Sequence, residues 1–184
     1  QVPAVVARFP SIVSMPSSLT SPARSHGGMT QTVVLRVGPL AAAEVLAVAR
    51  GGARVELGAD ALAEMARSRA VIEGLADDTE PHYGVSTGFG ALATTSIPVE
   101  RRADLQRSLI RSHAAGTGPM VETEVVRALM LLRLSTLATG RTGVRVGTAQ
   151  AYADLLNAGL TPVVREYGSL GCSGDLAPLA HCAL

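Results

Sequence analysis

Residues 122–138 read ETEVVRALMLLRLSTLA and carry the strongest helix signal of the chain. Apolar residues recur there at helical spacing. Acidic residues stand early and arginines follow later, as the helix macrodipole favours. Gly140 comes shortly after the stretch and predicts where the helix ends. The stretch predicts a long helix and sets the expectation of a mainly α fold.

Other segments on both sides of this stretch also carry helix signals, with helical spacing or with start and stop residues at their ends. They are Ala41–Arg50, Asp60–Leu75, the segment from about Ser96 to His113, Thr142–Ala158 and Asp175–Leu184. Strand signals are confined to Thr32–Val37, Arg54–Leu57 and Val163–Val164. Between Asp77 and Ser96 a proline and several glycines break the pattern, which predicts a long functional loop. We therefore expect a mainly α domain with a few short strands.

The composition excludes several classes of protein. The 184 residues suffice for one sizeable core or for part of a larger fold. Lysine plus arginine number 16 against 15 acids, and aromatics are 3%, which gives no basis for nucleic-acid binding. No apolar run is long enough to cross a membrane. Cys172 and Cys182 form neither a disulfide framework nor a metal-ligand pattern, so we expect a cytoplasmic protein without a metal. Residues 88–93 (GFGALA) fit a loose dinucleotide fingerprint, but no buried strand precedes them, so we expect no nucleotide cofactor.

The first 28 residues differ from the rest of the chain. They contain no acid, several Ser and Pro residues, and Arg8 and Arg24. A transit peptide has this composition. Met29, however, has the character of a natural start, which favours a tag-like or upstream-translated tail. We therefore expect a disordered tail over residues 1–28 and a folded region over 29–184.

Residues 171–179 read GCSGDLAPL and permit unusual backbone chemistry. A Gly/Ser turn that opens a helix is usually only a cap. The Gly174 nitrogen is unhindered, however, and can attack the carbonyl carbon of Cys172. Ring closure with loss of two waters, one from the Ser173 hydroxyl, leaves a methylidene on an imidazolone, a strong electrophile. The positive end of the following helix would strengthen its pull on electrons.

A second glycine-bearing stretch indicates an alternative from a different class. Residues 84–88 read GVSTG and match the nucleophile elbow of serine hydrolases, with Ser86 as nucleophile and His113 or His181 as base. That elbow sits on a strand-to-helix turn of an α/β sheet. Because a mainly helical chain predicts no such sheet, the hydrolase is the distant alternative.

Three signatures together resemble those of one family, the aromatic amino acid lyases. Residues 168–184 resemble the methylidene-imidazolone loop of that family. Residues 82–90 (HYGVSTGFG) resemble its other glycine-rich signature, and residues 105–116 (LQRSLIRSHAAG) resemble the form in its histidine-specific members. The three stand in family order within residues 29–184. The resemblance implies the N-terminal portion of the helical lyase fold, truncated after the cofactor-forming loop, and a homotetramer at full length.

The resemblance also implies a reaction, the elimination of ammonia from an L-amino acid. The electrophile is a 4-methylidene-imidazol-5-one formed autocatalytically from Cys172, Ser173 and Gly174, and Ser173 supplies the carbon that reacts. The family usually has Ala before this serine. Cyclisation uses only the carbonyl carbon of Cys172, so the thiol need not block the ring. Tyr83 is the candidate base, and a phenol needs nearby positive charge or hydrogen-bond donors to act as one.

The implied substrate depends on His113, which the resemblance places on the substrate's side-chain ring together with Gly90. Taken alone, His113 shares a helical stripe with Ile110 and reads as a core histidine. A histidine at the ring can hydrogen-bond an imidazole or a phenol. This favours L-histidine first, with urocanate as product, and tyrosine second. An aminomutase with the same electrophile and a non-catalytic fragment remain open.

Overall fold

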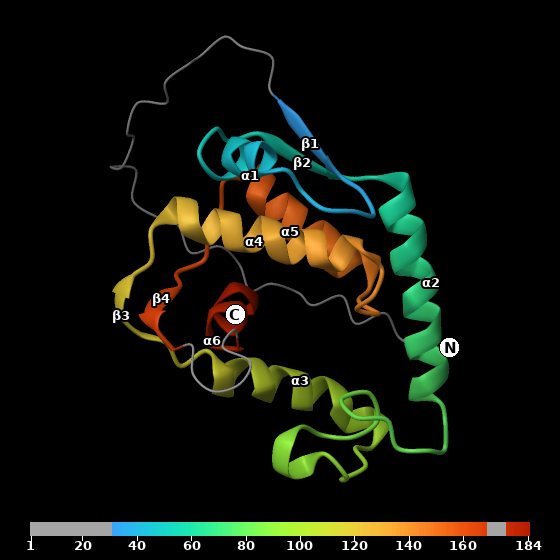
Figure 1. Ribbon diagram of the computed structural model, residues 1–184. Helices are drawn as coiled ribbons and strands as arrows, with labels where there is room; N and C mark the ends of the chain where they lie inside the picture. Colours follow the sequence, from blue (N-terminus) through green and yellow to red (C-terminus); the bar gives the residue numbers. More distant parts are fainter. Residues whose placement is uncertain (1–30, 169–175) are drawn as a thin grey trace.

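The computed structural model describes residues 31–168 and 176–184 (Figure 1). The predicted tail over residues 1–28 and the predicted cofactor triplet, residues 172–174, lie outside the described residues. Within the described part no helix is long and apolar enough to cross a membrane.

Helix α4 (Thr123–Ala138) lies at the centre of the larger body of the molecule (Figure 1). One side of it packs against α1 (Ala42–Ala49) and another against α5 (Val146–Asn157). Apolar residues spaced three and four apart form its buried stripe, as expected for a helix with neighbours on several sides. They are Val126, Met130, Leu131, Leu134, Leu137 and Ala138.

A short parallel sheet covers one end of these helices. It consists of β1 (Thr32–Leu35) and β2 (Arg54–Leu57), with the pairing running from Thr32↔Arg54 to Leu35↔Leu57. Asn157 attaches α5 to this sheet, because its side chain accepts the Val55 N–H at 2.8 Å and donates to the Val55 carbonyl at 2.9 Å. Helix α2 (Ala59–Ala76) then runs down the side of the molecule to the long loop (Figure 1).

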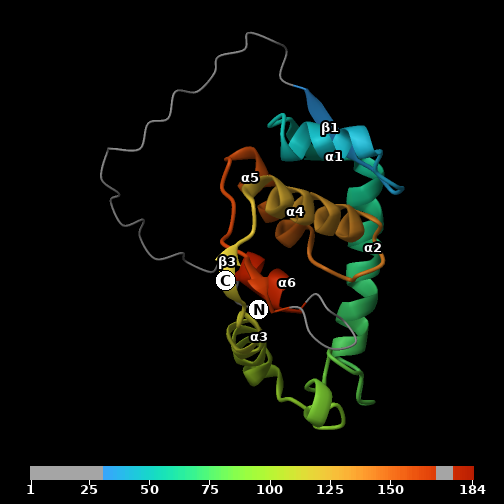
Figure 2. The ribbon, with the colours of Figure 1, turned by 60° about the vertical axis from the view of Figure 1, so that its left-hand side comes forward.

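The smaller body contains α3 (Val99–His113), the antiparallel pair β3 (Thr117–Met120) and β4 (Arg165–Tyr167), and α6 (Leu176–Ala183). Figure 2 shows α6 between α3 on one side and α4 with α5 on the other. Helix α3 buries none of its own residues. Its place therefore depends on α6 and on the segments at its two ends.

The mainly α prediction is confirmed, and most element bounds agree within a few residues. Two expectations were wrong. The strand expected at Val163–Val164 lies at β4 instead, and its partner β3 was not expected. Helix α5 begins at Val146 rather than at Thr142, because Gly143 has a positive φ of 63° that a helix does not accommodate. The loop expected from Asp77 to Ser96 is present and includes one short 3₁₀ helix, Gly90–Leu92.

Candidate active site

The loop between α2 and α3 is held by its own buried hydroxyl groups. Ser86 and Thr87 are 5% and 3% exposed. The Ser86 Oγ accepts the His82 N–H at 2.9 Å, and the Thr87 Oγ1 accepts the Gly84 N–H at 3.2 Å and donates to the Gly88 carbonyl at 3.0 Å. These bonds fix the turn that contains Tyr83, the base expected from the sequence.

This arrangement contradicts the geometry that a serine hydrolase needs. A turn, rather than a strand of a sheet, leads into Ser86. The Ser86 hydroxyl points into the loop and is engaged by the His82 amide, so it is not presented to a substrate. The two histidines expected as its base are engaged elsewhere: His113 with the Leu109 carbonyl, and His181 with the Gly116 amide.

Tyr83 stands on the surface of this loop with its ring supported from one side. Its ring meets that of Phe89 edge to face, with centroids 5.8 Å apart and planes at 83°. The Gly90 N–H donates to the Tyr83 Oη at a long 3.4 Å. Tyr83 is 64% exposed, so its hydroxyl is open to a bound molecule. The sequence thus brings Tyr83 and Gly90 into direct contact.

His113 is the last residue of α3, and its Nδ1 has two hydrogen-bonding neighbours. They are the Leu109 carbonyl oxygen at 2.8 Å and the Ser112 Oγ at 2.9 Å. In the tautomer that carries its proton on Nδ1, this nitrogen donates to the carbonyl, and Nε2 is the acceptor. The expectation of a core histidine was wrong: His113 is half-buried and lines a cavity, and α3 has no buried residue.

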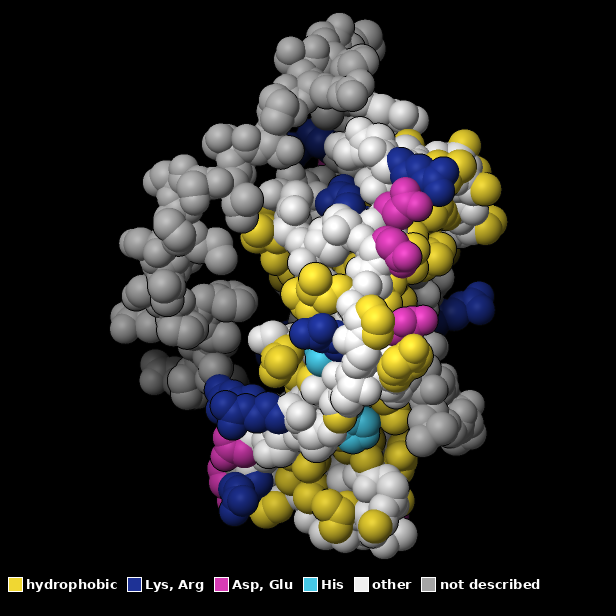
Figure 3. Space-filling model, turned by 90° about the vertical axis from the view of Figure 1, so that its left-hand side faces the viewer, with side chains coloured by type: hydrophobic (Ala, Val, Ile, Leu, Met, Phe, Trp, Pro, Cys, Tyr) yellow, Lys and Arg dark blue, Asp and Glu magenta, His cyan; other side chains and the backbone are white. Residues whose placement is uncertain are grey.

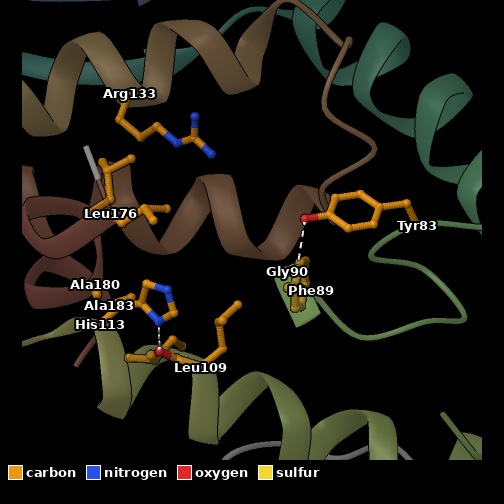
Figure 4. A pocket seen from close by; sticks show the side chains of 11 residues that line it. Tyr83, Phe89, Gly90, Leu109, His113, Arg133, Leu176, Ala180 and Ala183 are labelled. Carbon is orange, nitrogen blue, oxygen red and sulfur yellow. Dashed lines mark hydrogen bonds between the residues drawn. The ribbon is translucent and has the colours of Figure 1, made fainter. Parts of the chain in front are cut away.

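Tyr83, Gly90 and His113 line one cavity of about 560 Å³, although they come from two separate signatures. Figure 4 shows the Tyr83 hydroxyl and the His113 ring facing this space from different sides. Most of the remaining wall is apolar, supplied by Phe89, Leu109, Ile110 and residues of α6. An apolar cavity with a few convergent polar groups is the usual form of a small-molecule site.

Arg133 of α4 also lines this cavity, although its sequence pattern did not predict a place there. Its guanidinium reaches into the same space (Figure 4) and is the permanent charge among the described lining residues. Its signal in the sequence is an arginine inside the apolar run 129–134 of a helix. A positive group there favours negative charge on a substrate or on a phenol oxygen.

The wall formed by α6 begins directly after the predicted cofactor segment. Leu176, the first residue of α6, lines the cavity. On the other side of the segment, a Cβ added to Gly168 would lie 3.0 Å from the Cβ of Ala177. The described residues that flank the segment are therefore in contact, and one of them lies beside a residue that lines the cavity. This geometry fits an electrophilic group made from Cys172, Ser173 and Gly174, which themselves lie outside the described residues.

The chain is similar to proteins of known type over most of its length. The family model for aromatic amino acid lyases matches residues 40–184. The histidine ammonia-lyase of Streptomyces avermitilis is 64% identical over 153 residues, which are 83% of this chain and 30% of that protein. The chain thus spans about a third of the length of the curated relatives it matches.

Solved structures show the same fold. Ergothionase from Treponema denticola, an ergothioneine-degrading enzyme, superposes with a TM-score of 0.80 at 31% identity, over 84% of this chain and 31% of that one. Tyrosine aminomutase from Streptomyces globisporus gives a TM-score of 0.75 at 37% identity, over 83% and 28%. With the match over residues 40–184 and the shared helical fold, the chain belongs to the aromatic amino acid lyase family.

Proposed function

We propose that this protein is an ammonia-lyase that converts L-histidine to urocanate. The observation that carries the proposal is the single cavity that Tyr83, Gly90 and His113 line beside the start of α6. The substrate assignment is further supported by the 64% identical relative, which is named a histidine ammonia-lyase.

In this proposal, Cys172, Ser173 and Gly174 would form a methylidene-imidazolone autocatalytically, and this group would supply an electrophile that makes the substrate amine a better leaving group. The contact between the flanks of this segment, at Gly168 and Ala177, supports its place beside the cavity. Enzymatic elimination of ammonia also requires a base for the β-proton and a site that orients the side chain, and described residues supply candidates for both.

Tyr83 is the candidate base: as the phenolate, its Oη receives the proton from the substrate Cβ and becomes the neutral phenol. The Gly90 N–H, 3.4 Å from this oxygen, is placed to stabilise the negative charge that Oη carries before the proton transfer. The Arg133 guanidinium on the same cavity acts in the same direction over a longer range. The apolar wall excludes water and strengthens both effects.

His113 is the candidate contact for the side-chain ring of the substrate. Its Nδ1–H is held by the Leu109 carbonyl, which leaves Nε2 as an acceptor for the N–H of an imidazole. The same acceptor can take the O–H of a phenol. L-histidine is preferred here because of the relative's name, and tyrosine is the second candidate.

Two substitutions test this assignment with L-histidine as substrate. Tyr83→Phe removes the base and should lower kcat by about 10²- to 10⁴-fold, the usual effect of losing one. His113→Phe should lower kcat/KM about tenfold, the effect of one lost hydrogen bond. Tyr167→Phe is the matched control, because Tyr167 is an exposed β4 tyrosine outside the cavity, and it should act like wild type. Formation of urocanate at the wild-type rate by Tyr83→Phe refutes the role of the base.

Product analysis separates the remaining candidates. Urocanate from L-histidine supports the proposal, and coumarate from L-tyrosine supports the tyrosine lyase. A β-amino acid indicates an aminomutase. The 37% identical tyrosine aminomutase structure is the reason to test for this product. Intact mass tests the electrophile independently: a chain lighter by two waters has cyclised, whereas an unmodified mass indicates a non-catalytic precursor.

The proposal extends to a cytoplasmic homotetramer. The face that carries β3 and β4 shows hydrophobic side chains in several places (Figure 3), and Met120 and Val163 are among the exposed ones. Side chains of this kind are common at subunit contacts. Light scattering of the purified protein measures the mass of the assembly, and a monomeric mass would contradict this part of the proposal.

A further inference from the structure

Helix α6 has two faces with different neighbours. One face lines the cavity at helical spacing through Leu176, Leu179, Ala180 and Ala183. The other carries Ala177 and His181, which are four residues apart and therefore also neighbours on the helix surface. Their contacts are Gly168, just after β4, and Gly116, between α3 and β3. This second face is not explained by the cavity.

The contact of His181 is a hydrogen bond to backbone. The Gly116 N–H donates to the His181 Nε2 at 3.0 Å. Nε2 therefore carries no proton, and the ring is in its Nδ1–H form. The approach is so close that a Cβ at Gly116 would lie 2.8 Å from Nε2 and 3.1 Å from the Cβ of Arg165. Glycine is needed here for space rather than for conformation.

Gly116 is joined tightly to the proposed substrate-binding residue. The Ala114 N–H donates to the Ile110 carbonyl at 2.9 Å, and the Ala115 N–H donates to the His113 carbonyl at 2.8 Å. The connection from His113 to Gly116 is thus short and hydrogen-bonded at each step. No residue of α3 is fully buried, and the partly buried side chains at this end, Leu109, Ile110 and His113, line the cavity.

We propose that His181 is a positioning residue that sets the distance between His113 and the start of α6. Through Gly116 it holds the ring-binding end of α3 against the helix that follows the cofactor-forming segment. The width of the substrate cavity between these two elements then follows from one hydrogen bond. This inference rests on the proposed function for its effect on substrate, but the contact itself is measurable without turnover.

The test compares His181→Gln with His181→Phe. The Gln amide oxygen can accept the Gly116 N–H, whereas Phe fills similar space and accepts nothing. The Phe variant should raise KM for L-histidine about tenfold with a smaller change in kcat, and should exchange the Gly116 amide proton about tenfold faster, as expected for one lost hydrogen bond. The Gln variant should stay within about threefold of wild type in both.

Two further variants separate positioning from general loosening of α6. Cys182→Ala removes a buried side chain of the same helix without touching Gly116, so it should lower thermal stability and leave KM unchanged. Gly116→Ala disturbs the contact from the other side and should raise KM as His181→Phe does, which keeps the proposal testable if the Phe variant fails to fold. Intact mass of each variant shows whether the ring has formed.

A wild-type KM and a protected Gly116 amide in His181→Phe overturn the proposal. A Gln variant as impaired as the Phe variant also overturns it, since the acceptor would then be irrelevant. If wild type itself does not turn over L-histidine, the proposed function fails, and the Gly116 exchange rates alone decide whether His181 positions this segment.

Discussion

Replacing Arg127 with methionine tests how helices α1, α4 and α5 are held together. Arg127 is 8% exposed and lies on α4. Its Nη2 and Nε donate to the Val48 carbonyl at 3.0 and 3.3 Å, and its Nη1 donates to the Leu156 carbonyl at 3.2 Å. Both acceptors lie in the last turn of a helix, α1 or α5, where the macrodipole is negative and favours a cation. One side chain therefore joins three helices.

The magnitude follows from the two acceptors. Methionine fills much of the space but donates nothing. The Val48 carbonyl then loses its two bonds from Arg127, and the Leu156 carbonyl keeps only the Gly159 N–H at 3.2 Å, at a cost of about 1–3 kcal/mol for each acceptor. Relief of the cost of burying the guanidinium offsets part of this loss. We expect a net destabilisation of about 3 kcal/mol, which for a chain of this size lowers Tm by roughly 10 °C.

Urea unfolding followed by circular dichroism measures this difference. Arg127→Lys should fall between wild type and Arg127→Met, because an ammonium group is a compact charge without the planar fork that reaches both carbonyls. Arg141→Met is the control, since Arg141 is exposed and its loss should stay within about 0.5 kcal/mol. If Arg127→Met unfolds within about 1 kcal/mol of wild type, the inferred role of these bonds is refuted.

Two further predictions concern stability. Gly140→Ala should cost about 2–4 kcal/mol, because Gly140 has φ +68° and an added Cβ would lie 2.6 Å from the Glu64 carbonyl carbon. Gly147→Ala, in α5 with nothing within 4 Å, should instead stabilise by about 0.4–1 kcal/mol, and equal urea midpoints for the two would contradict the reading. The pKa of Asp60 lies below its ordinary value of 3.8, chiefly because its carboxylate accepts the Val37 N–H. A lowered folded pKa gives stability that is present above the unfolded pKa and is lost as pH falls through the folded pKa. Asp60→Asn should therefore flatten the fall of the urea midpoint below about pH 4, and an unchanged acid profile would show that Asp60 contributes nothing to it.

The helices were predictable because each carries its own periodic pattern and end signals. The β3–β4 pair was not. Thr117–Met120 contains a glycine and a proline, both poor strand formers, and the residues of its partner Arg165–Tyr167 are all exposed. Neither segment shows the alternation of a half-buried strand. Their pairing depends on tertiary contacts at Gly116 and Gly168, which no local pattern reveals.

Only part of the candidate site was predictable from the sequence. The roles of Tyr83, Gly90 and His113 came from resemblance, and the fold places these residues on one cavity. Residue spacing alone assigned His113 to a core, because helical periodicity does not distinguish a core from a cavity wall. Arg133 was missed for a related reason: on a helix, a single arginine in an apolar run gives no direction for its side chain until the neighbouring helices are placed.

Helix α3 is held by hydrogen bonds near both of its ends. Near its start, Arg102 donates to the Ala76 carbonyl at 2.9 Å and to the Ile97 carbonyl at 3.1 Å; at the other end is the Gly116–His181 bond. Arg102 lies about 16 Å from His113 along the helix at 1.5 Å per residue, and Gly116 follows His113 by three residues outside the helix. A tilt about Gly116 therefore moves His113 less than it moves Arg102. Changes in the loop before α3 therefore reach the ring-binding end of α3 in reduced form, whereas Tyr83 lies in that loop and moves with it. The proton-accepting and ring-binding sides of the cavity thus respond to such changes to different degrees.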